Sequence, residues 1–253
     1  MNLQAIIFDY DGVLADTERL HLRAMQETLA PLRIGLREDE YFERYLGLDD
    51  EGVFRAIGED RKLGWGEDVL QGLVADKASR FQATLAAVVN RAPNAAGAPP
   101  AGPQMPLLFP GAAERLAAWS REVGVAIASG SIRTEIEQVL EAEGLLHVVS
   151  AIVAAGETER GKPFPDPYVR ALDLLQSRRD LELEPLAAGR CLVIEDSPWG
   201  IDAARAAGMK VVAVATSYRA DRLAAADLVV EQLQDLDLGR LEKVVGGSPT
   251  DRR

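Results

Sequence analysis

Two pairs of acidic residues lie in short polar segments that directly follow apolar runs of the sequence. Asp9 and Asp11 follow the first apolar run, and Glu195 with Asp196 follows a later one. Each pair could form a turn or cap a helix, because aspartate is common in both places. If both pairs share one crevice, two unit charges about 4 Å apart repel by roughly 4 kcal/mol at an effective dielectric of about 20. A divalent cation would offset this repulsion, and oxygen ligands suit Mg²⁺ rather than zinc.

Two further segments could hold an anion. Ser129 and Gly130 belong to a Ser-Gly-Ser turn between a predicted strand and a predicted helix, where a hydroxyl and backbone N–H groups can bind phosphate. Serine also caps helices, so that alternative stays open for Ser129. Lys162 is followed by Pro163 and Pro165, which restrict the backbone and favour a fixed ammonium group over the solvated one of most lysines.

Together these groups predict phosphoryl transfer. A bound Mg²⁺ and Lys162 would neutralise the phosphate oxygens, and Ser129 with nearby N–H groups would orient them. Asp9 would attack phosphorus in line and form an aspartyl phosphate. Asp11 would protonate the leaving alcohol and then take a proton from the water that hydrolyses the intermediate.

The elements that must position these residues follow from the apolar pattern. Short apolar runs predict buried strands at residues 5–8, 125–128, 152–155, 192–194, 211–215 and, more weakly, 228–230. Helical spacing lies between them, at residues 133–143, 168–176 and 200–207. This alternation predicts an α/β fold with a Rossmann-like parallel sheet and right-handed crossovers. Because the carboxyl ends of parallel strands face one crevice, the polar segments are expected to meet there.

A helical segment interrupts this pattern after the first strand. Its apolar residues recur at helical spacing, strand-like runs are absent, and a stretch rich in Pro, Ala and Gly follows it. We therefore expect an α/β catalytic core made of residues 1–16 and 107–253. An inserted all-helical cap domain would span 17–90, and a linker would span 91–106.

Composition narrows the possible partners. Acidic residues number 40 against 28 basic ones, and a net charge of -12 argues against nucleic acid or an anionic membrane surface as a partner. The single cysteine excludes an intramolecular disulfide, and two histidines exclude a zinc site built on several of them. With no apolar stretch of roughly 20 residues and no signal-peptide pattern at the start, we expect a cytoplasmic protein.

Four motifs in this order resemble those of the haloacid dehalogenase-like hydrolase superfamily. They are Asp9-Tyr10-Asp11-Gly12-Val13, Ser129, Lys162 and Glu195-Asp196. The longer string at 8–18 and the segment at 161–168 resemble the subgroup with a small helical cap. That subgroup includes β-phosphoglucomutase, phosphoglycolate phosphatase and sugar-phosphate phosphatases.

The resemblance implies roles for these residues. Asp9 would be the nucleophile and Asp11 the general acid and base, while Ser129 and Lys162 would hold the phosphate. Mg²⁺ would be bound by Asp9, the backbone carbonyl of Asp11 and Asp196, with Glu195 close by or bridging through water. The dehalogenases of the superfamily lack the second aspartate and need no metal, so Asp11 and Asp196 argue against dehalogenation.

The resemblance also implies substrate-binding residues around the cap, which should close over the site and supply specificity. These residues are Thr17, His21, Gly47, Lys77 and, in the core, Gly130. For His21 a packing role stays open. In β-phosphoglucomutase-like sequences an arginine near the position of Asp50 grips a second phosphate. Here three acids stand at 49–51, which weakens the mutase hypothesis.

The expected function is therefore that of a Mg²⁺-dependent phosphatase acting on a small phosphorylated metabolite, either a sugar phosphate or a phosphoglycolate-like compound. A freely swinging cap favours a monomer. The alternatives are a β-phosphoglucomutase-like phosphosugar mutase and a non-catalytic regulatory protein that keeps the fold.

Overall fold

The computed structural model describes residues 2–46, 48–89, 107–178 and 184–247. The chain divides into two compact units, which we call the core and the cap. The core comprises Met1–Asp16 and Pro106–Arg253, and the cap comprises Thr17–Met105. The predicted linker at 91–106 lies outside the described residues, so the predicted domain boundaries stay a prediction.

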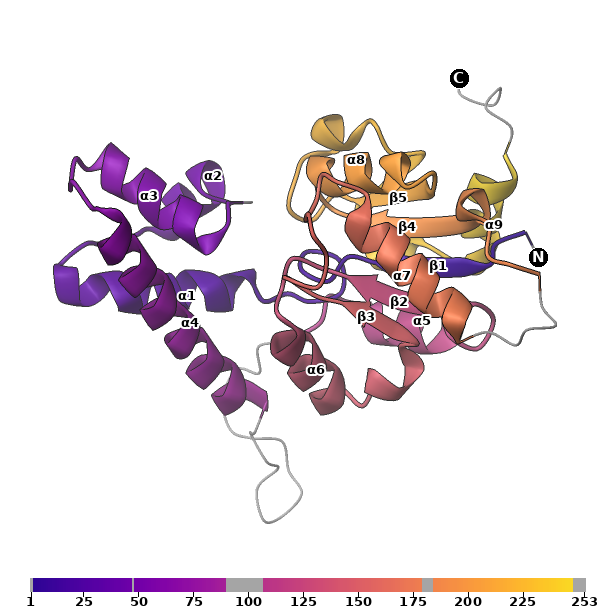
Figure 1. Cartoon of the computed structure of the whole chain (residues 1–253), viewed down its shortest axis with the longest axis horizontal. Helices are drawn as coiled ribbons and strands as arrows, with labels where there is room; N and C mark the ends of the chain where they lie inside the picture. Colours follow the sequence, from indigo (N-terminus) through magenta and orange to yellow (C-terminus); the bar gives the residue numbers. More distant parts are fainter. Residues whose placement is uncertain (1, 47, 90–106, 179–183, 248–253) are drawn as a thin grey trace, which may run out of the picture. The chain divides into compact units, whose positions relative to one another are not determined.

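The described part of the core contains one six-stranded sheet, in which every pairing is parallel. The strands are β1 (Ala5–Phe8), β2 (Gly124–Ala128), β3 (Ala151–Val153), β4 (Cys191–Glu195), β5 (Lys210–Val214) and β6 (Leu228–Val230). Their order is β3-β2-β1-β4-β5-β6, which is that of doubly wound Rossmann-type sheets. The predicted α/β class is thereby confirmed (Figure 1).

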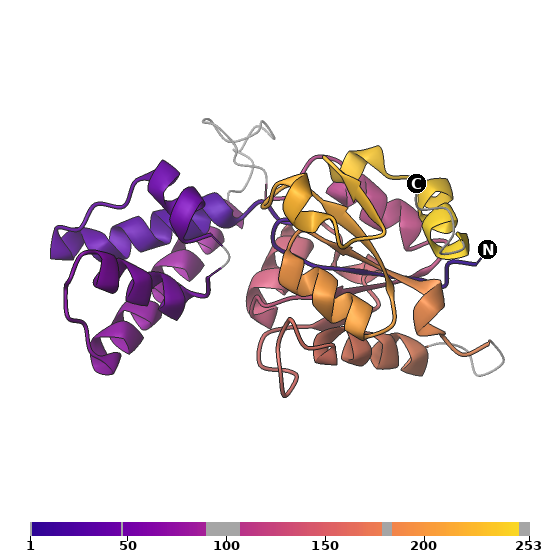
Figure 2. The same ribbon diagram turned by 90° about the horizontal axis from the view of Figure 1, so that it is seen from above.

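Helices lie on both sides of this sheet, as Figure 2 shows. They are α5 (Ala112–Trp119), α6 (Arg133–Ala142), α7 (Asp166–Ser177), α8 (Pro198–Ala206) and α9 (Leu238–Gly246). Successive residues of a strand point to opposite faces. Ile7 accordingly packs in a cluster with residues of α7 and α8, while the ring of Phe8 stacks on Trp119 of α5 at 5.9 Å. Both faces of β1 are covered, which explains its continuous apolar sequence.

The cap is all-helical over its described residues, as predicted. Its helices are α1 (Glu18–Leu29), α2 (Glu38–Arg44), α3 (Asp50–Asp60) and α4 (Glu67–Val89). They enclose an apolar core of their own, which includes Met25, Tyr45, Phe54 and Leu70. Short 3-10 turns complete the two units at Ala30–Leu32, Leu146–Val148, Ala188–Arg190, Ala220–Leu223 and Leu233–Asp235. Across the described residues, no helix combines the length and the apolar character of a membrane-spanning segment.

Because β1 lies in the middle of the sheet, truncating one of its side chains should destabilise the fold. Ile7→Ala should lower the free energy of unfolding by about 2–5 kcal/mol, because Ile7 is fully buried and its truncation leaves a cavity. Val169→Ala, at an exposed position of α7, should change it by less than about 0.5 kcal/mol. Urea unfolding followed by circular dichroism measures both values. Equal losses in the two variants would contradict the burial of β1.

Candidate active site

The ammonium group of Lys162 joins two carboxylates from neighbouring strands. Its Nζ lies 2.7 Å from Asp9 Oδ1 and 2.7 Å from Glu195 Oε1. Asp9 directly follows β1, and Glu195 is the last residue of β4, which pairs with β1. Lys162 belongs to the loop between β3 and α7. Three sequence-predicted residues therefore meet at the carboxyl end of the sheet.

The sheet itself holds the polar residues in place beyond the ends of the strands. The backbone N–H of Asp9 donates to the carbonyl of Ile194 at 2.9 Å, which continues the pairing of β1 with β4. The N–H of Ser129 likewise donates to the carbonyl of Val153 at 2.9 Å, beyond β2 and β3. Because the hydrogen-bonded ladder extends into these segments, their side chains start from fixed backbone positions.

A second acidic residue completes a cluster that could hold a metal ion. One carboxylate oxygen each from Asp9, Glu195 and Asp196 lies within 4.8 Å of the other two, and all three residues are buried. The side chain of Asp11 lies outside this cluster and accepts a hydrogen bond from the hydroxyl of Ser131. The cluster thus brings together three of the four predicted metal ligands through their side chains.

Gly12 leaves room for this arrangement. Its φ of 76° is a left-handed conformation that favours glycine. A Cβ at this position would overlap the carboxylate of Asp196 and lie 2.6 Å from Ser217 Oγ. The carbonyl of Gly12 also accepts a hydrogen bond from the hydroxyl of Thr216. The glycine of the first motif is therefore required by the close approach of three segments.

Comparison of the chain with known proteins identifies its family. The model of the family described as "Haloacid dehalogenase-like hydrolase" matches residues 6–214. The chain belongs to the haloacid dehalogenase-like hydrolases. Protein CbbY of Rhodobacter capsulatus is 32% identical over 240 residues, which are 92% of this chain and 95% of that protein. The fructose-1-phosphate phosphatase YqaB of Escherichia coli is 29% identical and covers 83% of this chain, with 95% of its own length covered.

Solved structures agree with this assignment. The crystal structure of CbbY from Rhodobacter sphaeroides in complex with phosphate has a TM-score of 0.72 at 25% identity. The match covers 95% of this chain and 99% of that one. A β-phosphoglucomutase from Clostridium difficile has a TM-score of 0.71 at 22% identity, over 96% of this chain and 97% of that one. The second likeness shows the fold alone.

The electrostatics of this hydrolase site favour a further positive charge. Burial raises the pKa of Asp9 to about 7, although the nearby Lys162 ammonium opposes the change. Burial, together with the charges of Glu195 and Asp9, raises the pKa of Asp196 well above its ordinary value. Burial alone would lower the pKa of Lys162, but the carboxylates of Asp9 and Glu195 raise it instead. A single ammonium therefore leaves the carboxylates undercompensated, and a divalent cation fits this oxygen donor set.

Two of the predicted cap residues, His21 and Lys77, form a cluster with Asp50. The Lys77 ammonium is buried and lies 2.7 Å from His21 Nδ1 and 2.7 Å from Asp50 Oδ1. The His21 ring stacks on Phe81 at 4.0 Å, and burial followed by the charge of Lys77 lowers the pKa of His21 well below its ordinary value. Thr17 is buried at the start of α1, and its carbonyl accepts hydrogen bonds from the first turn.

Two of the predicted substrate-binding residues are glycines. Gly130 is exposed next to Ser129 in the core. Gly47 lies outside the described residues. The substrate-binding roles of both residues stay predictions.

Sequence reasoning missed several side chains that contact the site. Ser131 donates to Asp11, Ser217 donates to Asp196, and Tyr168 donates to Glu195 Oε1 at 2.8 Å. A signal for Ser217 was present, because it follows β5 just as the other site residues follow their strands. Ser217 thus lies at a fifth strand end of the same edge of the sheet.

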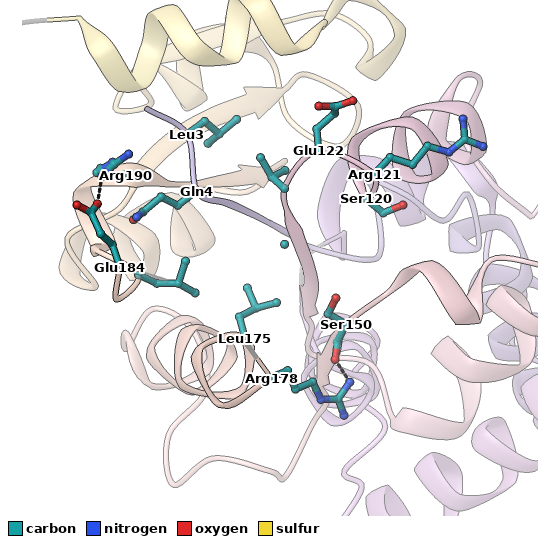
Figure 3. A pocket seen from close by; sticks show the side chains of 13 residues that line it. Leu3, Gln4, Ser120, Arg121, Glu122, Ser150, Leu175, Arg178, Glu184 and Arg190 are labelled. Atoms are coloured by element: carbon teal, nitrogen blue, oxygen red, sulfur yellow. Dashed lines mark hydrogen bonds and ion pairs between the residues drawn. The ribbon is translucent and has the colours of Figure 1, made fainter. Parts of the chain in front are cut away.

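A separate hollow of about 620 Å³ lies at the opposite end of the sheet, where the strands begin (Figure 3). Its lining includes Leu3, Gln4, Ser150 and Arg190, which precede β1, β3 and β4. The guanidinium of Arg178 donates to the carbonyl of Ser150, and Arg190 donates to the carbonyl of Asn2 at 2.9 Å. These cations are engaged by the backbone, and the acidic cluster lies elsewhere.

The raised pKa of Asp9 predicts how pH affects stability. A carboxyl group with a folded-state pKa near 7 and an unfolded value near 4 favours the folded state below pH 4, and this contribution is lost as pH rises through 7. In EDTA, the melting temperature should therefore fall between pH 4 and pH 8. Mg²⁺ should raise it at pH 8 and have little effect at pH 5, where protonation competes with binding.

Thermal unfolding of the wild type and of Asp9→Asn, with EDTA or with Mg²⁺, measures this effect. The variant lacks the titrating group and should show a weaker pH dependence in EDTA. An equal Mg²⁺ effect at both pH values in the wild type would contradict the prediction.

Proposed function

We propose that this haloacid dehalogenase-like phosphatase hydrolyses small phosphorylated sugars in a Mg²⁺-dependent reaction through an aspartyl-phosphate intermediate. The observation that supports the proposal is the meeting of Lys162 with Asp9 at 2.7 Å, beside the buried cluster that Asp9 forms with Glu195 and Asp196. A cation and several carboxylates in one buried place suit the binding of a phosphate dianion together with a metal ion.

The proposed mechanism assigns the first half-reaction to Asp9. A carboxylate oxygen of Asp9 attacks phosphorus, and the bond between phosphorus and the alcohol oxygen breaks. Asp11 gives its proton to the departing alcohol. The ammonium of Lys162 neutralises the transferring phosphoryl group, and the hydroxyl of Ser129 and the N–H of Gly130 orient it.

In the second half-reaction, water replaces Asp9 on phosphorus. Asp11, now ionised, takes a proton from this water, the Asp9–phosphorus bond breaks, and phosphate leaves. Mg²⁺, when bound, supplies charge neutralisation for the phosphate and the nucleophile. Its proposed ligands are the side chains of Asp9 and Asp196 and the carbonyl of Asp11.

Sugar monophosphates are the proposed substrate class. YqaB is named a fructose-1-phosphate phosphatase, and a solved structure of CbbY contains xylulose-1,5-bisphosphate. In the cap, Asp50 neutralises Lys77 at 2.7 Å, so this lysine is not a free cation for a second phosphate. We therefore propose monophosphates ahead of bisphosphates, and hydrolysis ahead of a mutase reaction. We also propose that the protein is a cytoplasmic monomer without a nucleic-acid or membrane partner, which its net charge of -12 supports.

Replacement of the nucleophile tests the mechanism. Asp9→Asn should lower kcat at least about 1,000-fold, because an amide is a poor nucleophile of nearly the same size. Asp202→Asn makes the same chemical change at an exposed position of α8 and should leave kcat within twofold. Phosphate release in the presence of Mg²⁺ measures both. Substantial activity in Asp9→Asn would show that another group attacks phosphorus.

A panel of phosphate esters tests the substrate class. With Mg²⁺, phosphate should be released from sugar monophosphates, and EDTA should stop the release. A hexose 1-phosphate given together with its bisphosphate should also release phosphate. Isomerisation without net release would favour the mutase, and a complete lack of release from every ester would favour a non-catalytic protein.

A further inference from the structure

The carboxylate of Glu195 differs from the other acidic groups of the site in the number of hydrogen bonds that it accepts from the protein. The side chain of Glu195 is completely buried. Oε1 accepts hydrogen bonds from Lys162 at 2.7 Å and from the Tyr168 hydroxyl at 2.8 Å. Oε2 accepts bonds from the N–H groups of Asp196 and Ser197 and from the Ser197 hydroxyl, each at 2.9 Å. A carboxylate offers about four lone-pair positions, so five donors leave no free position for a metal ion.

The first turn of α8 is shaped around this carboxylate. A Cβ on Gly200 would overlap the carboxylate carbon and both oxygens of Glu195. The N–H of Gly200 donates to the Ser197 hydroxyl at 3.1 Å, which in turn donates to Glu195. Because Glu195 has neither free space nor a free lone pair, its orientation is fixed before any ligand binds.

Tyr168 links α7 to the same carboxylate. The residue is fully buried, its hydroxyl donates to Glu195, and its ring centre lies 5.1 Å from Lys162 Nζ. Lys162 and Tyr168 therefore share one acceptor atom, Oε1. The ammonium is also bonded to Asp9, so its position reflects how strongly each of the two carboxylates attracts it.

We propose that Glu195 and Tyr168 are positioning residues that hold the Lys162 ammonium beside Asp9, and that Glu195 is not a metal ligand. This inference rests on the proposed function, in which Lys162 neutralises the transferring phosphoryl group. Without the Tyr168 hydroxyl, Oε1 has only Lys162 as a donor. The carboxylate then draws the ammonium toward itself and away from Asp9 and the phosphate.

Tyr168→Phe tests the proposal by removing one oxygen atom. We expect kcat/KM to fall about tenfold and the inhibition constant of inorganic phosphate to rise by a similar factor, because a hydrogen bond to a charged group is lost. The Mg²⁺ concentration for half-maximal activity should stay within twofold. Tyr45→Phe removes a buried hydroxyl that donates to a carboxylate in the cap, Asp60 at 2.8 Å, and should change none of these values. Unchanged phosphate inhibition in Tyr168→Phe would overturn the proposal.

Glu195→Gln tests whether Glu195 is a metal ligand, and Asp196→Asn, at a proposed ligand, serves as the comparison. We expect Glu195→Gln to weaken phosphate inhibition and leave the Mg²⁺ requirement within twofold, and Asp196→Asn to raise that requirement at least tenfold. An equal rise in both variants would make Glu195 a ligand and overturn the proposal. This pair also decides the question if Tyr168→Phe fails to fold.

Crystal structures of the wild type, of Tyr168→Phe and of Glu195→Gln test the positioning independently of the proposed function. The Lys162 Nζ to Asp9 Oδ1 distance should change in a variant, and identical positions in all three would overturn the inference. If the wild type released no phosphate from any ester, the proposed function would fail, but the crystallographic comparison would still decide whether Glu195 and Tyr168 fix Lys162.

Discussion

The ammonium of Lys162 lies between two buried carboxylates, and most features of the site follow from this contact. One positive charge cannot balance Asp9, Glu195 and Asp196, so burial raises the pKa of both aspartates. For Glu195 burial acts in the same direction, but Lys162 and the surrounding hydrogen bonds lower its pKa overall. The three carboxylates therefore differ in how their negative charge is stabilised. The protein stabilises the charge of Glu195, whereas the two aspartates are left for the proposed cation and, in the case of Asp9, for the proposed attack on phosphorus.

Neutral hydroxyl groups hold these carboxylates without adding charge. Ser131 contacts Asp11, Ser217 contacts Asp196 and Tyr168 contacts Glu195. A lysine or arginine in any of these places would compete with Lys162 and with the proposed Mg²⁺. Hydroxyl donors orient each carboxylate and leave its charge to attract the ligands.

The sequence was informative about the strands for a simple reason. A sheet covered on both faces gives continuous apolar runs such as Ala5–Phe8, and the polar residues after them are conspicuous. The helices were less visible, and α5 and α9 were not predicted at all. Ser217 could have been found from its place after β5, but the contacts of Ser131 and Tyr168 could not be predicted, because serine and tyrosine are common in turns and helices. Only the order of the strands brings Ser217, after β5, against Asp196, after β4.

The middle position of β1 has a consequence for how the polypeptide reaches its native state. The cap follows β1 in the sequence, and the neighbours of β1 come from 124–128 and 191–195. The centre of the sheet is therefore made of contacts with large sequence separation, whose closure entropy slows folding. The cap helices contact one another over smaller sequence separations than these strands, as α1 and α4 do, and can form first. Asp9 meets Asp196 only after β1 has paired with β4, the most distant strand pairing of the described sheet, so catalytic competence should be among the last properties acquired.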